Sequence, residues 1–275
     1  MDNHIQISII TLTKDDFIKF SRTLKSLKKQ KINFKIEWLI IDGSEIKYQK
    51  KINTLTKKNF KKDLQSLIKI RHINSTTLVL NGIYRCMNYG KKISKGKFII
   101  FLNSGDEFFN DKSLQILFDN SFKANTNLSI IFGQAHVISQ SNLNWYFPGT
   151  KVNNIKNWLK FFEPNHQSML ISNQLASKFD FSLEHDLLAD GYWKRKILKN
   201  ALDIVYIKKP LVRFFLDGIS STKPSKKTLK SILGNKKIRF FRKLIFILKF
   251  LLPSKMFYFY SLMQKYKSYL FDLIL

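Results

Sequence analysis

Two short acidic motifs that follow apolar runs are the first candidates for chemistry. Asn103-Ser-Gly-Asp106 follows the run 97–102, and Asp42-Gly-Ser44 follows the run 36–41. A carboxylate beside a side-chain amide at the tip of a rigid strand can hold Mg²⁺ or Mn²⁺, which prefer oxygen ligands and complete their shells with water and phosphate oxygens. Asp106 alone supplies too few oxygen ligands for a metal ion. The motif therefore fits best with a bound molecule whose own diphosphate supplies further oxygen ligands. Each aspartate taken singly could also be an ordinary turn residue.

The pattern of apolar residues predicts an open α/β sheet that would carry both motifs on one edge. We expect strands at 7–12, 36–41, 97–102 and 128–133, and helices at 17–31 and 83–93. About thirty residues separate the first two strands, which is the length of one β-α-β unit with parallel strands. Ligands of such sheets bind outside the carboxyl ends of the strands, where Asp42 and Asp106 are expected.

The second half of the chain is less regular. We expect a short strand at 169–171 after His166-Gln167-Ser168, and a helix at 183–197 that carries Glu184, Asp186 and Asp190. Residues 46–71 form a Lys-rich amphipathic stretch that we interpret as a solvated face. We place a boundary near residue 225, so that 1–225 is an α/β domain and 226–275 is a basic, aromatic-rich helical tail.

The large positive charge gives only weak support for nucleic-acid binding. The chain of 275 residues has 48 Lys+Arg and 19 Asp+Glu, a net charge of +29. Only seven of the basic residues are Arg, the side chain that reads bases and clamps phosphates. A 44% hydrophobic content excludes a disordered basic protein. We therefore interpret most of the charge as a Lys bias of the composition.

The segment 236–252 concentrates charge on an amphipathic helix. Lys236, Arg239, Arg242, Lys243 and Lys249 share one face, and Phe, Ile and Leu residues occupy the other. Such a helix is typical of binding to an anionic membrane surface, and a helix that packs on the domain is the alternative. We expect no signal peptide and no membrane-spanning segment, which favours a cytoplasmic protein peripheral to the inner face of the cell membrane.

Seven motifs follow one another along the chain and together span about residues 5–222. They are Ile7–Thr11, Trp38–Ser44, Gly82–Asn88, Gly96–Asp106, Asn165–Ser168, Leu188–Asp190 and Gly218–Ser220. No single motif would suffice, but the ordered set resembles family 2 inverting glycosyltransferases of the GT-A fold, of the kind found in colanic-acid and other bacterial surface-polysaccharide pathways.

The resemblance implies a function and a role for each candidate residue. It implies transfer of a sugar, with inversion, from a nucleotide-diphospho-sugar to a growing glycan or lipid-linked acceptor. Asp190 would be the catalytic base, and Asp106 would bind the divalent cation, Mn²⁺ or Mg²⁺, on the donor diphosphate. Asp42 would contact the nucleotide base and Thr11 would form a wall of its pocket. Asn103 would contact the nucleotide-sugar, and His166 and Gln167 would line the donor or acceptor side of the cleft.

The residue chemistry agrees with these roles, and a few positions depart from the family pattern. Inverting transfer needs one carboxylate for the acceptor proton and a cation for the leaving diphosphate, so a second catalytic acid is not required. Leu80, Arg85 and Gln134 stand where the family commonly has acidic residues. A nucleotidyltransferase, an inactive homologue and a nucleic-acid-binding protein are the alternatives.

Overall fold

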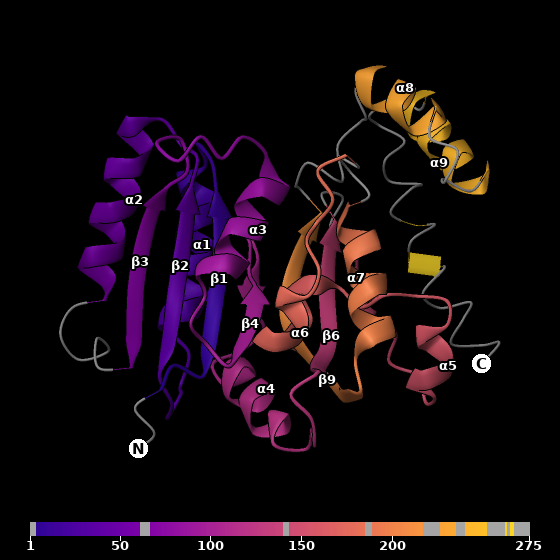
Figure 1. The fold of residues 1–275 in the computed structure, drawn as a ribbon, viewed down its shortest axis with the longest axis horizontal. Helices are drawn as coiled ribbons and strands as arrows, with labels where there is room; N and C mark the ends of the chain where they lie inside the picture. The colour runs from indigo at the N-terminus through magenta and orange to yellow at the C-terminus, as the bar shows by residue number, and fades with distance from the viewer. Residues whose placement is uncertain are drawn as a thin grey trace.

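The chain forms an open, mixed β-sheet with helices on both faces (Figure 1). The computed structural model describes residues 4–60, 67–139, 143–184, 189–216, 226–234 and 240–251, with Leu262, Lys265 and Tyr266. Within these residues the sheet has nine strands in the order β3-β2-β1-β4-β8-β6-β9-β5, with β7 paired to β6. The strands are β1 Ile7–Thr13, β2 Ile36–Asp42, β3 Ile68–Asn74, β4 Phe98–Phe101, β5 Glu107–Phe108, β6 Ser129–Ser139, β7 Asn144–Phe147, β8 Met169–Ser172 and β9 Asp203–Leu216.

The first half of the sheet is parallel, as the spacing of its strands predicts. β1 pairs in parallel with β2 and with β4, and β2 pairs in parallel with β3. The register aligns Thr13, Asp42 and Asn74 at the ends of three neighbouring strands. The carboxyl ends of these strands therefore form one edge, which is the edge expected to carry the chemistry.

Helices cover both faces of this half because the strands are apolar on both faces. Helices α1 Phe17–Lys28 and α2 Ile46–Asn59 lie on one face, and α3 Ile83–Ile93 lies on the other. Alternate side chains of β1 follow this division, since Ile9 belongs to one apolar cluster and Ile10 to the other. We predicted that residues 46–71 form one solvated face. This prediction was wrong in part, because β3, a strand of the sheet, begins at Ile68.

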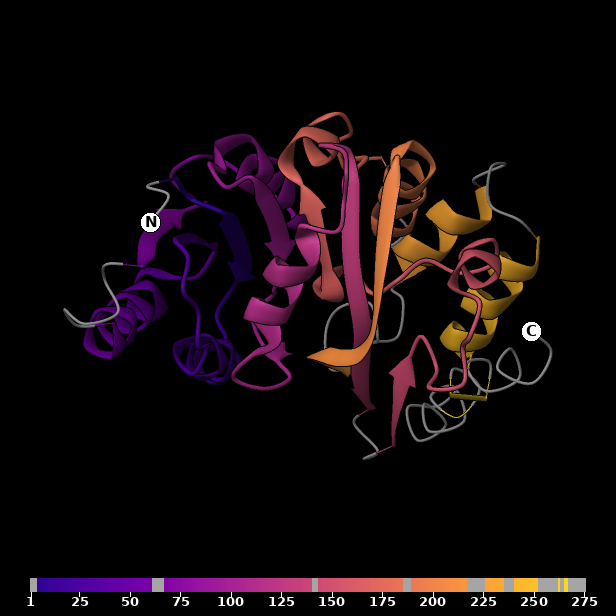
Figure 2. The same cartoon turned by 90° about the horizontal axis from the view of Figure 1, so that it is seen from below.

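The second half of the sheet reverses direction. β8 is antiparallel to both β4 and β6, whereas β6 and the long β9 run parallel and side by side (Figure 2). The register between β6 and β9 shifts at Gly133–Gln134, opposite a segment that contains Pro210, which cannot donate a ladder hydrogen bond. A Cβ on Gly133 would lie 2.9 Å from the backbone carbonyl oxygen of Lys209 and 2.4 Å from Leu211 Cδ1, so this bulge favours glycine. β5 pairs with the end of β9 and thereby holds the 103–106 turn against it.

The remaining helices connect and border the second half. They are α4 Ser113–Ser121, α5 Ile155–Leu159, the single 3₁₀ turn η1 His166–Ser168, α6 Asn173–Ser177, α7 Ala189–Asn200, α8 Lys226–Gly234 and α9 Phe240–Leu251. The expected helix at 183–197 differs at its start, because Leu183 and Glu184 are not helical and the described part of the helix runs from Ala189 to Asn200. Asp186, Leu188, Gly218–Ser220, Lys236 and Arg239 lie outside the described residues.

The basic tail is helical over the part that the structure describes. α8 and α9 lie against each other beyond the end of the sheet, and Lys243 Nζ donates to the carbonyl of Leu233 at 2.7 Å. Leu251 and Leu244 are exposed. Among the described helices none combines the length and the apolar character that crossing a bilayer demands.

Candidate functional site

Asp106 is held at the carboxyl edge of the sheet by four separate elements. It follows Gly105, whose φ of 105° favours glycine, in the turn between β4 and β5. Its carboxylate is buried and accepts hydrogen bonds from Gln167 Nε2 at 3.0 Å and from the Phe215 N–H at 3.3 Å. The hydroxyl of Thr23, on α1, donates to the Asp106 carbonyl at 2.8 Å. The carboxylate therefore has a fixed position and a small exposed edge.

A single 3₁₀ turn connects Asp106 to the rest of the candidate site. Asn165 begins η1 by accepting the backbone N–H of Gln167 on its side-chain oxygen at 3.0 Å. The turn directs Gln167 toward Asp106, and it places the ring of His166 between two other residues. His166 Nε2 lies 3.5 Å from Asn103 Nδ2, and Nδ1 lies 3.5 Å from Asp190 Oδ2. Five of the residues identified from the sequence therefore form one connected group.

Two amide oxygens in this group have no hydrogen-bond partner among the described residues. They are Asn103 Oδ1 and Gln167 Oε1, and both atoms are buried. Buried polar atoms in native proteins nearly always have a partner, so an unpaired pair indicates a missing ion, water or ligand. Oxygen donors beside a carboxylate suit Mg²⁺ or Mn²⁺. The described residues contain no cluster of three or more His, Cys, Asp or Glu, so a cation here would depend on amide and ligand oxygens.

Asp190 stands at the other end of the group, in the first turn of α7. Its carboxylate lies 3.7 Å from Lys194 Nζ, one helical turn along, and 3.5 Å from His166. Burial acts to raise the pKa of Asp190, but the charge of Lys194 and the hydrogen bond to His166 outweigh it and hold this pKa well below its usual range. The side chain is 33% exposed. Asp190 is therefore ionised at neutral pH and within reach of a ligand.

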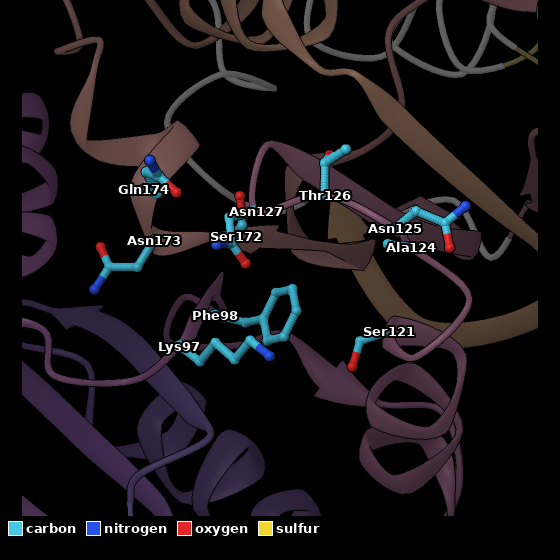
Figure 3. A pocket seen from close by; sticks show the side chains of 10 residues that line it. All are labelled: Lys97, Phe98, Ser121, Ala124, Asn125, Thr126, Asn127, Ser172, Asn173 and Gln174. Atoms are coloured by element: carbon cyan, nitrogen blue, oxygen red, sulfur yellow. The ribbon is translucent and has the colours of Figure 1, made fainter.

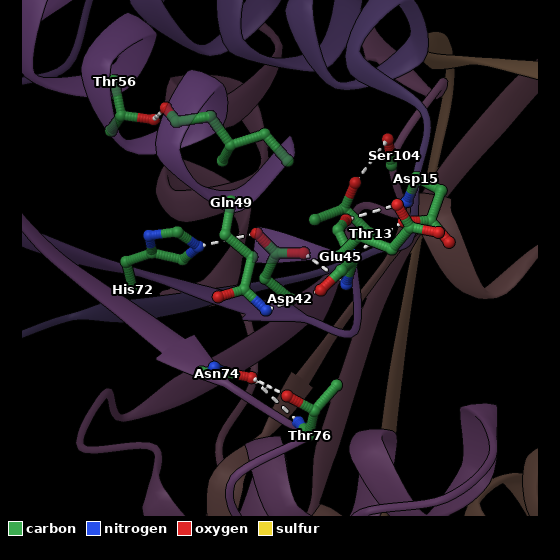
Figure 4. A network of polar contacts seen from close by, with 12 residues as sticks. Thr13, Asp15, Asp42, Glu45, Gln49, Thr56, His72, Asn74, Thr76 and Ser104 are labelled. Carbon is green, nitrogen blue, oxygen red and sulfur yellow. Dashed lines mark hydrogen bonds and ion pairs between the residues drawn. The ribbon is translucent and has the colours of Figure 1, made fainter. Parts of the chain in front are cut away.

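Asp42 and Thr11 lie apart from this group and are fully buried. Asp42 Oδ1 accepts the Ser44 N–H at 2.9 Å, and Oδ2 lies 2.8 Å from His72 Nε2 (Figure 4). The Thr11 hydroxyl donates to the Leu102 carbonyl and accepts from Trp38 Nε1. Both side chains shape the edge of the sheet from within, and their contact with a nucleotide stays a prediction.

His72 was missed by the sequence analysis because β3 was not expected. The ring extends from β3 toward Asp42 on β2, and its side chain is 20% exposed. The alternating isoleucines Ile68 and Ile70 could have indicated this strand. A histidine on a strand next to the one that ends in Asp42 would then have been a candidate partner for the carboxylate.

The three departures from the family pattern have different surroundings. Gln134 is buried at the β6 bulge and donates from Nε2 to the Pro148 carbonyl at 3.0 Å, which gives it a structural function. Leu80 packs on the apolar cluster under α3. Arg85 is exposed on α3. Of the three, Arg85 has a side chain accessible to a ligand.

A pocket of about 580 Å³ lies at the opposite edge of the sheet (Figure 3). Its wall includes Lys97 and Phe98 at the start of β4, Asn125 and Asn127 after α4, and Asn173 on α6. None of the candidate residues lines it. Because strands of the α/β half end on the other edge, this pocket is separate from the site built around Asp106.

The comparisons with known proteins identify the fold. No protein-family model and no curated protein sequence matches the chain. The structure is similar to the crystal structure of S. aureus TarS 1–349, with a TM-score of 0.59 and 16% identity over 90% of this chain and 71% of that chain. It is similar to the same protein in complex with UDP-GlcNAc, with a TM-score of 0.61 and 15% identity over 90% of this chain and 72% of that one. At these identities the likeness shows the fold alone, and the chain has the GT-A glycosyltransferase fold.

Proposed function

We propose that the protein is a family 2 glycosyltransferase that transfers a sugar, with inversion, from a nucleoside-diphospho-sugar to a cell-surface or lipid-linked glycan. The group Asp106–Gln167–His166–Asp190, at the carboxyl edge of a GT-A sheet, carries the proposal. TarS structures with UDP and UDP-GlcNAc support the class of donor. The ordered motifs support the inverting class and the hexosyltransferase type.

Asp190 is the catalytic base in this proposal. The acceptor hydroxyl attacks the anomeric carbon, the bond from that carbon to the diphosphate oxygen breaks, and the hydroxyl proton passes to the Asp190 carboxylate. The low pKa of Asp190 keeps its carboxylate ionised at neutral pH, and its exposure leaves room for an acceptor. His166 fixes the position of the carboxylate by contact at 3.5 Å.

Asp106, Asn103 Oδ1 and Gln167 Oε1 would hold a divalent cation, Mn²⁺ or Mg²⁺. The two unpaired amide oxygens support this, because a cation would supply the partner that each lacks. Gln167 would have to turn its amide, since Nε2 now donates to Asp106. When bound, such a cation stabilises the negative charge of the leaving diphosphate.

Donor binding and transfer can be tested separately. Thermal-shift screening against UDP-, GDP- and dTDP-sugars with Mn²⁺ should identify a donor that raises the unfolding temperature. Asp106→Ala should weaken this metal-dependent binding, and Asp190→Asn should abolish transfer while donor binding persists. Asp119→Asn, an exposed position on α4, is the matched control. Full transfer by Asp190→Asn would contradict the catalytic assignment. If no nucleotide-sugar raised the unfolding temperature, the proposed function would be contradicted.

The tail gives a second proposal, which is peripheral binding to the anionic inner face of the cell membrane through 236–252. Exposed leucines on α9 and the excess of basic residues support it. Flotation with vesicles of anionic lipid should show binding of the full chain that Leu251→Glu weakens. Leu202→Glu is matched in exposure, 68% against 66% for Leu251, and should leave binding unchanged. Equal loss in both variants would contradict membrane contact through α9.

A further inference from the structure

The buried pair Asp42–His72 leaves only the histidine available to a ligand. Asp42 has no exposed surface, and each of its carboxylate oxygens already has a partner, Ser44 N–H or His72 Nε2. The His72 side chain retains 20% exposure. A molecule at this end of β2 and β3 would therefore touch the imidazole before it could reach the carboxylate. This geometry differs from a direct contact of Asp42 with a nucleotide.

The carboxylate of Asp42 also determines which nitrogen of the His72 ring can accept a hydrogen bond. Asp42 Oδ2 is an acceptor, so the neutral ring places its hydrogen on Nε2, 2.8 Å away. Nδ1 then carries a lone pair. Within the described part of the chain no hydrogen bond reaches Nδ1 of His72. The pair thus presents an oriented nitrogen acceptor at the carboxyl edge of the sheet.

The position along this edge fits the base of a nucleotide whose diphosphate lies at Asp106. The strand order β3-β2-β1-β4 puts three strand spacings between β3, which carries His72, and β4, which leads to Asp106. At about 4.8 Å for each spacing, this is about 14 Å. A nucleoside diphosphate has its base at one end and its terminal phosphate at the other, so a molecule of this class can extend between the two places.

We propose that His72, oriented by Asp42, selects the donor nucleotide by accepting a hydrogen bond from a base N–H. Uracil carries such a hydrogen on N3, whereas N3 of cytosine is itself an acceptor and would face the Nδ1 lone pair. The inference rests on the proposed function and extends it to the choice of base. Its consequence is a preference for a uridine over a cytidine diphosphate. A site built around a buried hydrogen bond rejects the ligand that lacks the matching group.

The test compares the affinity of the full chain for UDP and for CDP by titration calorimetry with Mg²⁺. The native chain should bind UDP at least about tenfold more tightly. His72→Gln keeps an amide N–H for Asp42 and a carbonyl acceptor for the base, so it should retain the preference. His72→Lys can pair with Asp42 but has only donors, so it should lose or reverse the preference. Neither variant leaves Asp42 buried without a partner.

Lys69→Gln, an exposed change on the same strand, should keep the native ratio and serves as the control. Equal affinity of the native chain for UDP and CDP would overturn the inference. The proposed function would not be contradicted by that result, because the chain would still bind a nucleotide. A UDP preference that persists in His72→Lys would also overturn it. Binding of neither nucleotide, nor of any other nucleoside diphosphate, would instead refute the proposed function.

Discussion

Replacing Gln167 by Glu tests the contact at the centre of the site without need of a substrate. The change keeps the size of the side chain but places a second carboxylate about 3 Å from that of Asp106, where both residues are at least 95% buried. Two carboxylates so close cannot both ionise, and one must keep a proton. Holding that proton at pH 7, about 2.7 pH units above the ordinary glutamate pKa, costs about 3.7 kcal/mol. The shared proton makes a hydrogen bond in place of the one that Gln167 Nε2 donates in the native chain, so no hydrogen bond is gained and we expect a loss of about 3.7 kcal/mol.

The sign of the pH dependence follows from the shared proton. The pKa of the carboxylate pair is raised in the folded variant, so its cost is full at pH 7 and shrinks as the pH falls toward the ordinary glutamate value. Urea unfolding in the presence of a chelator, at pH 7 and pH 5, measures this loss relative to the native chain. Gln174→Glu, exposed on α6, is the control and should change stability little.

Two results would contradict this reasoning about Gln167. Native-like stability of Gln167→Glu at pH 7 would show that the two side chains are not in contact. A deficit that stays the same at pH 5 would indicate lost packing rather than charge. Addition of Mn²⁺ should stabilise Gln167→Glu more than the native chain, because a cation pairs with both carboxylates. No gain in either protein would refute the metal site.

Two further substitutions address the base and the packing of the sheet. Lys194→Met should raise the pKa of Asp190, because it removes the positive charge that does most to lower this pKa. The acid limb of the pH profile of kcat/KM should then move to higher pH. Lys196→Met, an exposed change on the same helix, should leave the limb in place. If the limb moved in neither variant, Lys194 would not control the pKa of Asp190. Gly96→Ala would put Cβ 2.4 Å from the backbone of β1 and should cost about 3 kcal/mol or more, measured by urea unfolding. Gly191→Ala, in an open position on α7, should be neutral or stabilising by about 0.5 kcal/mol, and equal losses would refute the packing argument.

The parallel half of the fold could be predicted because its signals are local. β-branched runs and their thirty-residue spacing indicate β1, β2 and the helix between them, and the structure confirms each. The local signals of β3 and of the long β9 are weaker, and neither strand was predicted. β3 lies within Lys-rich sequence, and β9 contains Pro210 and charged residues that are tolerated at a bulge and along a partly exposed strand. Tertiary pairing outweighs weak propensity there.

The same difference between local signals and tertiary contacts applies to the candidate site. The motifs identified Asp106, Gln167, His166, Asn103 and Asp190, and the structure brings all five together. The internal orientation of Asp42 and Thr11 was not predictable, because burial of an edge residue depends on which side chains arrive from other strands.

The sequence by itself determined the alternation of strand and helix and the turns that carry carboxylates, since periodicity and turn chemistry act over a few residues. Only the tertiary structure decided which groups face one another. It placed His72 on Asp42 from a neighbouring strand, and it placed Lys194 and His166 on either side of Asp190. Hydrogen bonds and charge interactions act over a few ångströms in space. Folding of the sheet brings these groups that close together, whatever their separation along the chain.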